Sequence, residues 1–468
     1  MNKIIEMNHL QFVYEDGTCA LKNICFDVEQ GQVILLVGRS GCGKSTLLNI
    51  LNGIIPEIIE GDLQGELIID GQKNTKLYQR SKIFGNVFQN PRSQFFTNNT
   101  TSEMVFAMEN HGFSYKEMKQ RLEEVVEEYQ IQSLLNRNIF HLSSGQRQLL
   151  ALLSSLMMKP KVLIFDEPSA NLDYGNAMRL KKQMLRLKQE GKTIFIADHR
   201  YYYLDGIVDK VLLIEDKQLF TFDTLSDFMA SPYCKRTFYL FDDRYPKKDI
   251  YKGNQMMIEV KGLGYKHILQ DLHIKFYKYE VTTLIGVNGV GKTTFARLLL
   301  KLLKPDHGSI TTNHRMLYVM QDADFQLFGS SVLKELEITS KNHKKNEEAL
   351  KLLNLWHLKD HHPQTLSGGE KQRLQLALCF VCQEEILILD EPTSGLDKES
   401  MEHVLDMLQL LKKEKTIILI SHDYEFIRKI SDRIVYLSNQ SIKEDFYLEE
   451  NHIETLNTIY KEMENYYE

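Results

Sequence analysis

The feature that most constrains this chain is that its second half repeats the motifs of its first half. GRSGCGKST begins at Gly38 and GVNGVGKTT begins at Gly286, and both satisfy the G-x-x-x-x-G-K-[ST] pattern of a phosphate-binding loop. Each stretch follows a short apolar run and precedes a helix-like pattern, which is the strand, loop and helix order that the motif requires. The sequence therefore predicts two phosphate-binding loops of the same kind.

The repeat continues downstream at nearly constant spacing. Ser143, the first serine of LSSGQ, lies 23 residues before Asp166, and Ser367 of LSGGE lies 23 residues before Asp390. A histidine follows each aspartate, after 33 residues in the first half and after 32 in the second. Each half also alternates apolar strands with helical patterns. This alternation predicts an α/β fold with a mainly parallel sheet and helices on both faces.

Length and composition fit this organisation. The chain has 468 residues, of which 43% are hydrophobic and 26% charged, as is typical of folded domains. Its formal net charge of -6 disfavours binding to nucleic acid through a broad basic surface. No apolar run reaches the roughly 20 residues of a membrane-spanning helix. We therefore expect a protein that stays in the cytoplasm, where any role at a membrane must come through a partner.

The six cysteines are scattered along the chain, which fits a reducing compartment. Cys379 and Cys382 form a Cys-x-x-Cys, but they fall on an amphipathic helical pattern, and we expect a buried pair rather than a metal site. Turn-forming residues and mixed charge replace clear periodicity between the halves. We place the first domain at residues 1–235, a linker at 236–255 and the second domain at 256–468. The acidic stretch from Glu444 is predicted to be a solvated helical face.

The two loops are expected to bind the phosphates of a nucleotide. Their glycines let consecutive backbone N–H groups point at phosphate oxygens, and the following helix adds its positive end. Lys44 and Lys292 would reach the β- and γ-phosphates, and Ser45 and Thr293 would ligate Mg²⁺ through their hydroxyls. The predicted loop residues are Gly38, Ser40, Gly41, Gly43, Lys44, Ser45 and Thr46 in the first half, and Gly286, Asn288, Gly289, Gly291, Lys292, Thr293 and Thr294 in the second.

Paired carboxylates end a second apolar strand in each half, in VLIFDEP and ILILDEP. Asp166 and Asp390 would lie at the carboxyl end of the strand, where α/β sheets bind their ligands, and hold Mg²⁺. Glu167 and Glu391 would polarise the attacking water. A purely structural role is a poor explanation for a charged pair at the end of a buried strand, because burying these charges without a cation is costly.

Further polar side chains follow other strands at matched positions. His199 and His422 recur at nearly the same offset from the acidic pairs, which favours a γ-phosphate sensor over a core histidine. Gln89 and Gln321 end further strands and are candidates to ligate Mg²⁺ or orient water. Two tyrosines precede the loops, and both stacking on adenine and ordinary packing remain open for them. They are Tyr14 and Tyr265.

These motifs together closely resemble the ATP-binding cassette (ABC) ATPases, in tandem. The family's signature is similar to LSSGQ and LSGGE, and its D-loop to NLD and GLD. The resemblance implies two P-loop domains, each with an antiparallel β subdomain and a helical subdomain, that bind ATP and Mg²⁺ and hydrolyse ATP. It also implies a head-to-tail sandwich, in which the Lys44 site uses Ser367 and Gly369 and the Lys292 site uses Ser143 and Gly145.

Shorter phrases resemble the fused double ATP-binding subunits of energy-coupling factor importers. They are NVFQNPRSQFF, a looser VMQDADFQLF, and LNGIIPE after the first loop. This resemblance implies a transmembrane scaffold subunit and a small substrate-binding membrane subunit as partners, and no nucleic acid. Two alternatives stay open. The chain could serve another ABC transporter class, or act on ribosomes as a soluble translation factor, although the short connector disfavours the latter.

The first signature departs from the family pattern, because Ser144 stands where the family has glycine. An added Cβ costs roughly 1 to 2 kcal/mol only where the backbone must be left-handed. We therefore expect the Lys292 site to hydrolyse ATP, because Glu391 and His422 are both present.

Overall fold

The computed structural model describes residues 3–73, 75–170, 172–200, 202–234 and 249–466. These residues divide into two compact units. Unit 1 comprises 1–172 and 176–240, and unit 2 comprises 173–175 and 241–468, and each unit is described by itself. Most of the predicted linker, at 236–248, lies outside the described residues.

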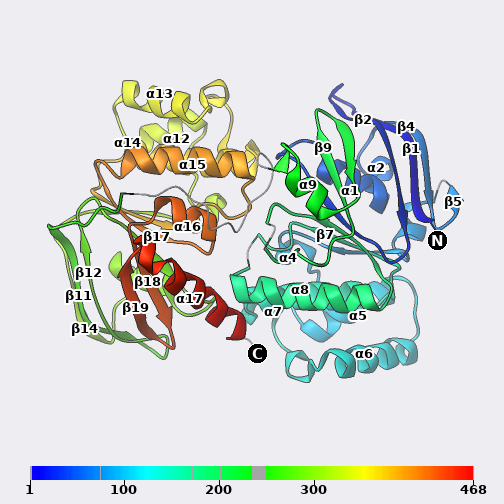
Figure 1. The fold of residues 1–468 in the computed structure, drawn as a ribbon, viewed down its shortest axis with the longest axis horizontal. Helices are drawn as coiled ribbons and strands as arrows, with labels where there is room; N and C mark the ends of the chain where they lie inside the picture. Colours follow the sequence, from blue (N-terminus) through cyan, green and yellow to red (C-terminus); the bar gives the residue numbers. More distant parts are fainter. Residues whose placement is uncertain (1–2, 74, 171, 201, 235–248, 467–468) are drawn as a thin grey trace. The chain divides into compact units, whose positions relative to one another are not determined.

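Unit 1 is built on two sheets (Figure 1). The central sheet has the order β10-β9-β3-β8-β7-β6 and is parallel except for β10, which pairs antiparallel with β9. Its strands are β3 (Val33–Val37), β6 (Phe84–Val87), β7 (Val162–Asp166), β8 (Thr193–Ala197), β9 (Lys210–Glu215) and β10 (Gln218–Phe222). The second sheet is antiparallel and contains β1 (Lys3–Tyr14), β2 (Cys19–Glu29), β4 (Gly61–Ile69) and β5 (Gln72–Lys73).

Unit 2 repeats the central sheet of unit 1 strand for strand, while its antiparallel sheet has no counterpart of β5 among the described residues. Its central sheet has the order β15-β16-β17-β13-β18-β19, again parallel except for its last strand. The strands are β13 (Val281–Ile285), β15 (Met316–Val319), β16 (Ile386–Asp390), β17 (Thr416–Ile420), β18 (Arg433–Ser438) and β19 (Ser441–Tyr447). The antiparallel sheet contains β11 (Met256–Tyr265), β12 (Leu269–Tyr277) and β14 (His307–Thr311). The predicted α/β class and tandem arrangement are thus confirmed.

Helices complete each unit. In unit 1 they are α1 (Lys44–Asn52), α2 (Ile54–Glu57), α3 (Leu77–Arg80), α4 (Pro91–Gln94), α5 (Thr100–Asn110), α6 (Tyr115–Tyr129), α7 (Ser144–Leu156), α8 (Tyr174–Gln189) and α9 (Leu225–Ala230). In unit 2 they are α11 (Lys292–Leu299), α12 (Val332–Thr339), α13 (His343–Leu352), α14 (Gly368–Val381), α15 (Lys398–Leu411), α16 (Tyr424–Ile430) and α17 (Ile453–Asn465). Among the described residues, none of these helices is long and apolar enough to cross a bilayer.

The central strands are short and apolar because both faces of the sheet are covered. All five residues of β3, β8, β13 and β17 are buried. Strands covered on both faces carry continuous hydrophobic runs instead of alternating ones. The side chains therefore change abruptly from apolar to polar where each strand ends, and the polar groups of the site lie at those ends.

Two local features lie outside the site. In unit 1, β4 and β5 form an antiparallel hairpin in which Ile68 pairs with Lys73 and Ile69 pairs with Gln72. Cys379 and Cys382 are both buried, at the end of α14, as expected for a packed pair.

Candidate functional site

The first phosphate-binding loop leaves the buried strand β3 and enters α1. The Lys44 ammonium donates to the carbonyls of Gly38 at 2.8 Å and Arg39 at 2.9 Å, so its charge lies within the curve of the loop. Gly38 has φ 152°, and a Cβ there would lie 2.5 Å from both the Cys42 sulfur and the Ile214 carbonyl oxygen. A glycine is therefore required at this position of the loop.

The second loop has the same geometry between β13 and α11. The Lys292 ammonium donates to the carbonyls of Gly286 at 2.7 Å and Val287 at 3.1 Å. Burial lowers the pKa of Lys292, while Glu391 and Asp390 oppose that shift. The remaining predicted loop residues surround these lysines in sequence. They are Ser40, Gly41, Gly43, Ser45 and Thr46 in unit 1, and Asn288, Gly289, Gly291, Thr293 and Thr294 in unit 2.

The structure brings three predicted groups of unit 1 together at the ends of β6, β7 and β8. The Gln89 amide donates to a Glu167 carboxylate oxygen at 2.6 Å, and the other Glu167 oxygen lies 3.4 Å from His199 Nε2. Glu167 has φ 45°, a conformation uncommon for a non-glycine residue. Burial, and then the neighbouring Glu167, raise the pKa of Asp166 to about 6.

Unit 2 gathers the corresponding groups and adds one. The Thr293 hydroxyl donates to Asp390 Oδ2 at 2.8 Å, and the Tyr318 hydroxyl donates to the same oxygen at 2.8 Å. Glu391, with φ 51°, lies 3.1 Å from His422 Nε2. Gln321 follows β15 by two residues, as Gln89 follows β6. Tyr318 was not predicted, since the first half has Asn86 at that position.

In each unit the signature serine caps a helix that is separate from the loops and strand ends described above. Ser143 is the N-cap of α7 and accepts from the Gln146 N–H, while Ser367 is the N-cap of α14 and accepts from the Glu370 N–H. Ser144 is the first residue of α7 and does not appear among the residues with positive φ. The first signature therefore keeps a regular helix start despite the substitution.

The following glycines differ in their surroundings. A Cβ on Gly145 would collide with the side-chain amide of Asn176, whereas a Cβ on Gly369 would meet its nearest atom at 3.6 Å. A Cβ on Gly368, the counterpart of Ser144, would have no neighbour within 4 Å. The first glycine position is thus open to a side chain, and in unit 1 the second is not.

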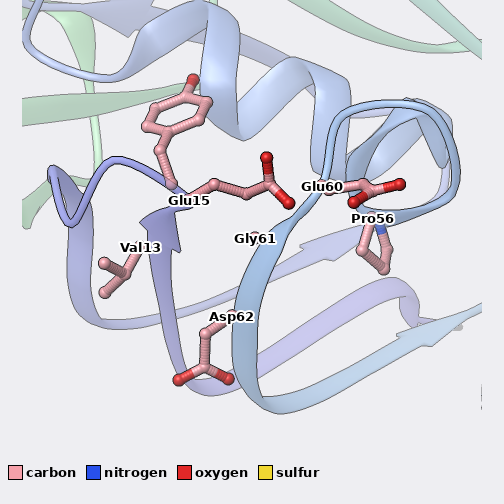
Figure 2. A pocket seen from close by; sticks show the side chains of 7 residues that line it. Val13, Glu15, Pro56, Glu60, Gly61 and Asp62 are labelled. Atoms are coloured by element: carbon pink, nitrogen blue, oxygen red, sulfur yellow. The ribbon is translucent and has the colours of Figure 1, made fainter.

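Tyr14 lies beside α1 and borders an acidic hollow. Its hydroxyl is 2.8 Å from that of Thr46, and its ring packs edge-on against Phe12 at 4.8 Å. The hollow measures about 700 Å³, and Glu15, Glu60 and Asp62 are among the residues that line it (Figure 2). A hydrogen bond with Glu60 raises the pKa of Glu15. Tyr14 thus has the packing contacts that the structural interpretation expects, and its stacking on adenine stays a prediction.

Tyr265 ends β11 and packs against the core of unit 2. The ammonium of Lys266 lies 5.1 Å from the centre of its ring. Both contacts belong to unit 2 itself, and here too adenine stacking remains a prediction.

Four residues that the motifs did not indicate hold the segment after each glutamine. Gln94 donates to the Asn86 carbonyl at 3.1 Å, and Gln326 donates to the Tyr318 carbonyl at 2.7 Å. The buried Glu103 accepts from the N–H groups of Phe96 and Thr97, and the buried Glu335 from those of Phe328 and Gly329. Comparing the two halves would have found them, because each pair follows Gln89 and Gln321 at equal offsets of 5 and 14 residues.

Comparison with known proteins identifies relatives over nearly the whole chain. A family model described as ABC transporter matches residues 21–170 and 269–394. A Treponema denticola protein named putative ABC transporter ATP-binding protein is 37% identical over 94% of this chain and 96% of its own length. A Bacillus subtilis protein named putative HMP/thiamine import ATP-binding protein is 29% identical over 95% of this chain and 91% of its own length.

Solved structures share the fold at low sequence identity. An archaeal ribosome recycling factor, solved with a ribosomal stalk protein, has a TM-score of 0.70 at 22% identity and covers 96% of this chain and 92% of that one. A structure named RNase-L inhibitor has a TM-score of 0.67 at 23% identity, with the same coverage. At such identities the likeness shows the fold alone.

Proposed function

This chain belongs to the ABC transporter family, and we propose that it is the ATP-hydrolysing subunit of an energy-coupling factor importer for a vitamin, a vitamin precursor or a metal ion. The chain is a tandem ABC ATPase that binds ATP.

Each unit carries the groups that ATP hydrolysis needs. We assign phosphate binding to the loop amides and to Lys44 and Lys292, and activation of water to Glu167 and Glu391. A carboxylate 3.4 Å or 3.1 Å from a histidine ring can take a proton from water while the imidazole holds its orientation. Gln89, which donates to Glu167, would help to orient that water in unit 1.

The donor groups fit Mg²⁺, which prefers oxygen ligands. In unit 2 a hydroxyl and a carboxylate already lie together, Thr293 and Asp390, and Gln321 follows the neighbouring strand. Ser45, Asp166 and Gln89 are the corresponding residues of unit 1. The ion would neutralise charge on the β- and γ-phosphates.

An exposed phenylalanine at the same position of both units carries the importer proposal. Phe96 is 76% exposed and Phe328 is 78% exposed, each seven residues after the glutamine that ends a site strand. Phe96 also stacks on Phe106 with ring centres 5.0 Å apart. The buried glutamates fix the backbone beside these rings, so both rings are presented at matched positions where a partner can cover them. We propose that these rings dock a transmembrane scaffold subunit, which holds the chain at the cytoplasmic side of the membrane and carries a small substrate-binding membrane subunit.

The names of the relatives also support the importer proposal. The Bacillus subtilis protein is named for HMP/thiamine import, and the Treponema denticola protein for an ABC transporter, and both align along nearly the full length of this chain. The phrases after Gln89 and Gln321 that resemble energy-coupling factor subunits contain the two exposed phenylalanines.

The test is purification of the tagged full chain from its own cells in mild detergent, with identification of the proteins that accompany it. We expect one helical scaffold and one or more small membrane proteins, and we expect Phe96→Ser with Phe328→Ser to lose them. Tyr115→Ser is the matched control, because Tyr115 is 77% exposed on α6 and should leave the complex intact. Recovery with ribosomes and no membrane protein would overturn the importer proposal.

A further inference from the structure

We infer that Asp198 is a positioning residue for the ATPase site of unit 1. It connects the loop that carries His199 to the segment that follows Glu167. The inference rests on the site residues proposed above for unit 1, and it does not depend on transport. Asp198 immediately precedes His199 and is 3% exposed.

The Asp198 carboxylate accepts hydrogen bonds from two separate segments. Within its own loop it accepts from the N–H groups of His199 at 2.7 Å and Arg200 at 3.0 Å. From the segment after β7 it accepts from the Ser169 hydroxyl at 3.0 Å and the Ser169 N–H at 3.3 Å. Several donors to one buried carboxylate form strong, charge-assisted bonds that fix its orientation.

Two side chains of the same loop complete the network. The buried Tyr203 hydroxyl donates to Asp198, and burial together with that carboxylate raises the pKa of Tyr203 well above its ordinary value, so the phenol stays a donor. The Arg200 guanidinium donates to the carbonyls of Ser169 at 3.1 Å and Leu172 at 3.5 Å. The loop that carries His199 is thus hydrogen-bonded to the segment after β7 through the Asp198 carboxylate and the Arg200 guanidinium.

The network lies next to the reacting groups. Ser169 follows Glu167 by two residues, and Asp198 precedes His199 by one. Because both ends of the pair Glu167–His199 are anchored to one buried carboxylate, their separation and direction are set together. Small errors in such geometry are costly for catalysis, since a displacement of about 1 Å can reduce a rate roughly 100-fold.

Unit 2 is built differently at the same positions. Ser421 stands where unit 1 has Asp198, and its hydroxyl accepts from the Asp423 N–H at 3.2 Å. Thr393 stands where unit 1 has Ser169, and within the part of the chain that the structure describes its buried hydroxyl has no hydrogen-bond partner. The carbonyl of His422 accepts instead from the Tyr460 hydroxyl at 3.1 Å. The tie between the two segments is therefore a property of unit 1.

The test compares Asp198→Asn with Ser421→Ala in the full chain, by steady-state ATP hydrolysis, binding of a fluorescent ATP analogue and thermal unfolding. The new amide of Asp198→Asn would present donors to groups that are themselves donors. Because both units are expected to hydrolyse ATP, Asp198→Asn is measured in the Glu391→Gln chain, so that turnover reports the unit 1 site. There we expect kcat to fall about tenfold, with KM and analogue affinity within twofold of the Glu391→Gln parent. Ser421→Ala, measured in the Glu167→Gln chain, should leave kcat within twofold of that parent.

Ser169→Ala keeps the test decisive if Asp198→Asn does not fold, because it deletes a single buried hydroxyl. We expect a two- to fivefold lower kcat, and no further loss when it is added to Asp198→Asn, as for residues that act together. An unchanged kcat in Ser169→Ala, or losses that are additive and parallel a lower melting temperature, would overturn the inference. Glu167→Gln separates the two levels: if it loses activity while Asp198→Asn does not, only the inference fails, and if it keeps full activity, the proposed site fails.

Discussion

Single residues at the start of α7 determine how much the first signature can change. Ser144 occupies a helical position, and its counterpart Gly368 has open space around a Cβ. We expect Ser144→Gly to leave ATP turnover within about twofold and to change the free energy of unfolding by less than about 1 kcal/mol. Steady-state hydrolysis and urea unfolding measure both quantities, and a several-fold gain in turnover would show that the serine impairs the site.

The next glycine offers a sharper comparison between the units. A Cβ at Gly145 collides with Asn176, whereas a Cβ at Gly369 finds ordinary contacts at 3.6 Å or more. Gly145→Ala should therefore force the side-chain amide of Asn176 to move, destabilise the chain by about 1 kcal/mol, at the low end of overpacking, and slow turnover. Gly369→Ala is the control and should be close to neutral in urea unfolding. Equal losses in both variants would contradict the packing explanation.

Asp166 predicts a pH dependence of stability. Its pKa rises from 3.8 to about 6 in the folded chain, so that between about pH 4 and pH 6 the folded state binds more protons than the unfolded state. The contribution of this carboxyl to stability therefore falls as pH rises through that window. Above it, the buried charge costs on the order of 3 kcal/mol. Without Mg²⁺, Asp166→Asn should be more stable than wild type at pH 8 and lose that advantage near pH 4 in unfolding experiments; parallel curves would contradict this.

The sequence indicated the residues of the site better than their connections. The loops, the carboxylates and the histidines were predicted because both halves repeat them, and the structure brings Gln89, Glu167 and His199 into contact. The Asp198 network was not predicted, because Ser421 replaces Asp198 in the second half and the repeat gave no signal there. Contacts that occur in only one half of the chain can be found only from the structure.

At the scale of elements, the C-terminal segment shows how charge can hide a packing pattern. The stretch from Glu444 was predicted as a solvated helical face, but its first residues complete β19 and only the later ones form α17. Leu456, Ile459, Tyr460 and Met463 are buried in the core of unit 2. The acidic residues lie between them, so the average composition suggested a solvated helix while the helical spacing indicated a buried stripe.

This helix should be necessary for the stability of unit 2. Ile459 is 3% exposed, and Ile459→Ala should lower the free energy of unfolding by about 2 to 5 kcal/mol, because it removes buried apolar atoms and leaves a cavity. Thr458→Ala, at the exposed neighbouring position, is the control and should change it by less than about 1 kcal/mol. Urea unfolding distinguishes the two, and a neutral Ile459→Ala would mean that α17 is peripheral.

At the scale of the whole molecule, the central sheets of the two units share one strand order, but the units anchor their proposed catalytic groups differently. Unit 1 has the Asp198 network, whereas unit 2 has Tyr318 on Asp390 and Tyr460 on the His422 carbonyl. A repeated fold therefore does not make the two sites equal. The repeat predicted that the two halves share one mainly parallel sheet plan, but the differences arise at positions where the halves diverge.

Both sites should nevertheless contribute to ATP turnover. Glu167→Gln and Glu391→Gln should each lower hydrolysis, since loss of a positioned general base costs about 10²- to 10⁴-fold at its own site. The double variant should retain only the residual rate. Single-turnover and steady-state assays of the full chain measure these rates. Unaltered turnover in Glu391→Gln, with complete loss in Glu167→Gln, would show that the second site is only a binding site.

The clamped phenylalanines have a consequence for the cell that makes this protein. Because Glu103 and Glu335 hold the backbone at Phe96 and Phe328, these rings stay in water for as long as no partner is present. Exposed apolar groups of this kind are recognised by chaperones and proteases. If a membrane subunit covers these rings, as proposed above, we expect an excess of this chain over that subunit to be degraded, so that its abundance follows that of the partner without any control of its synthesis.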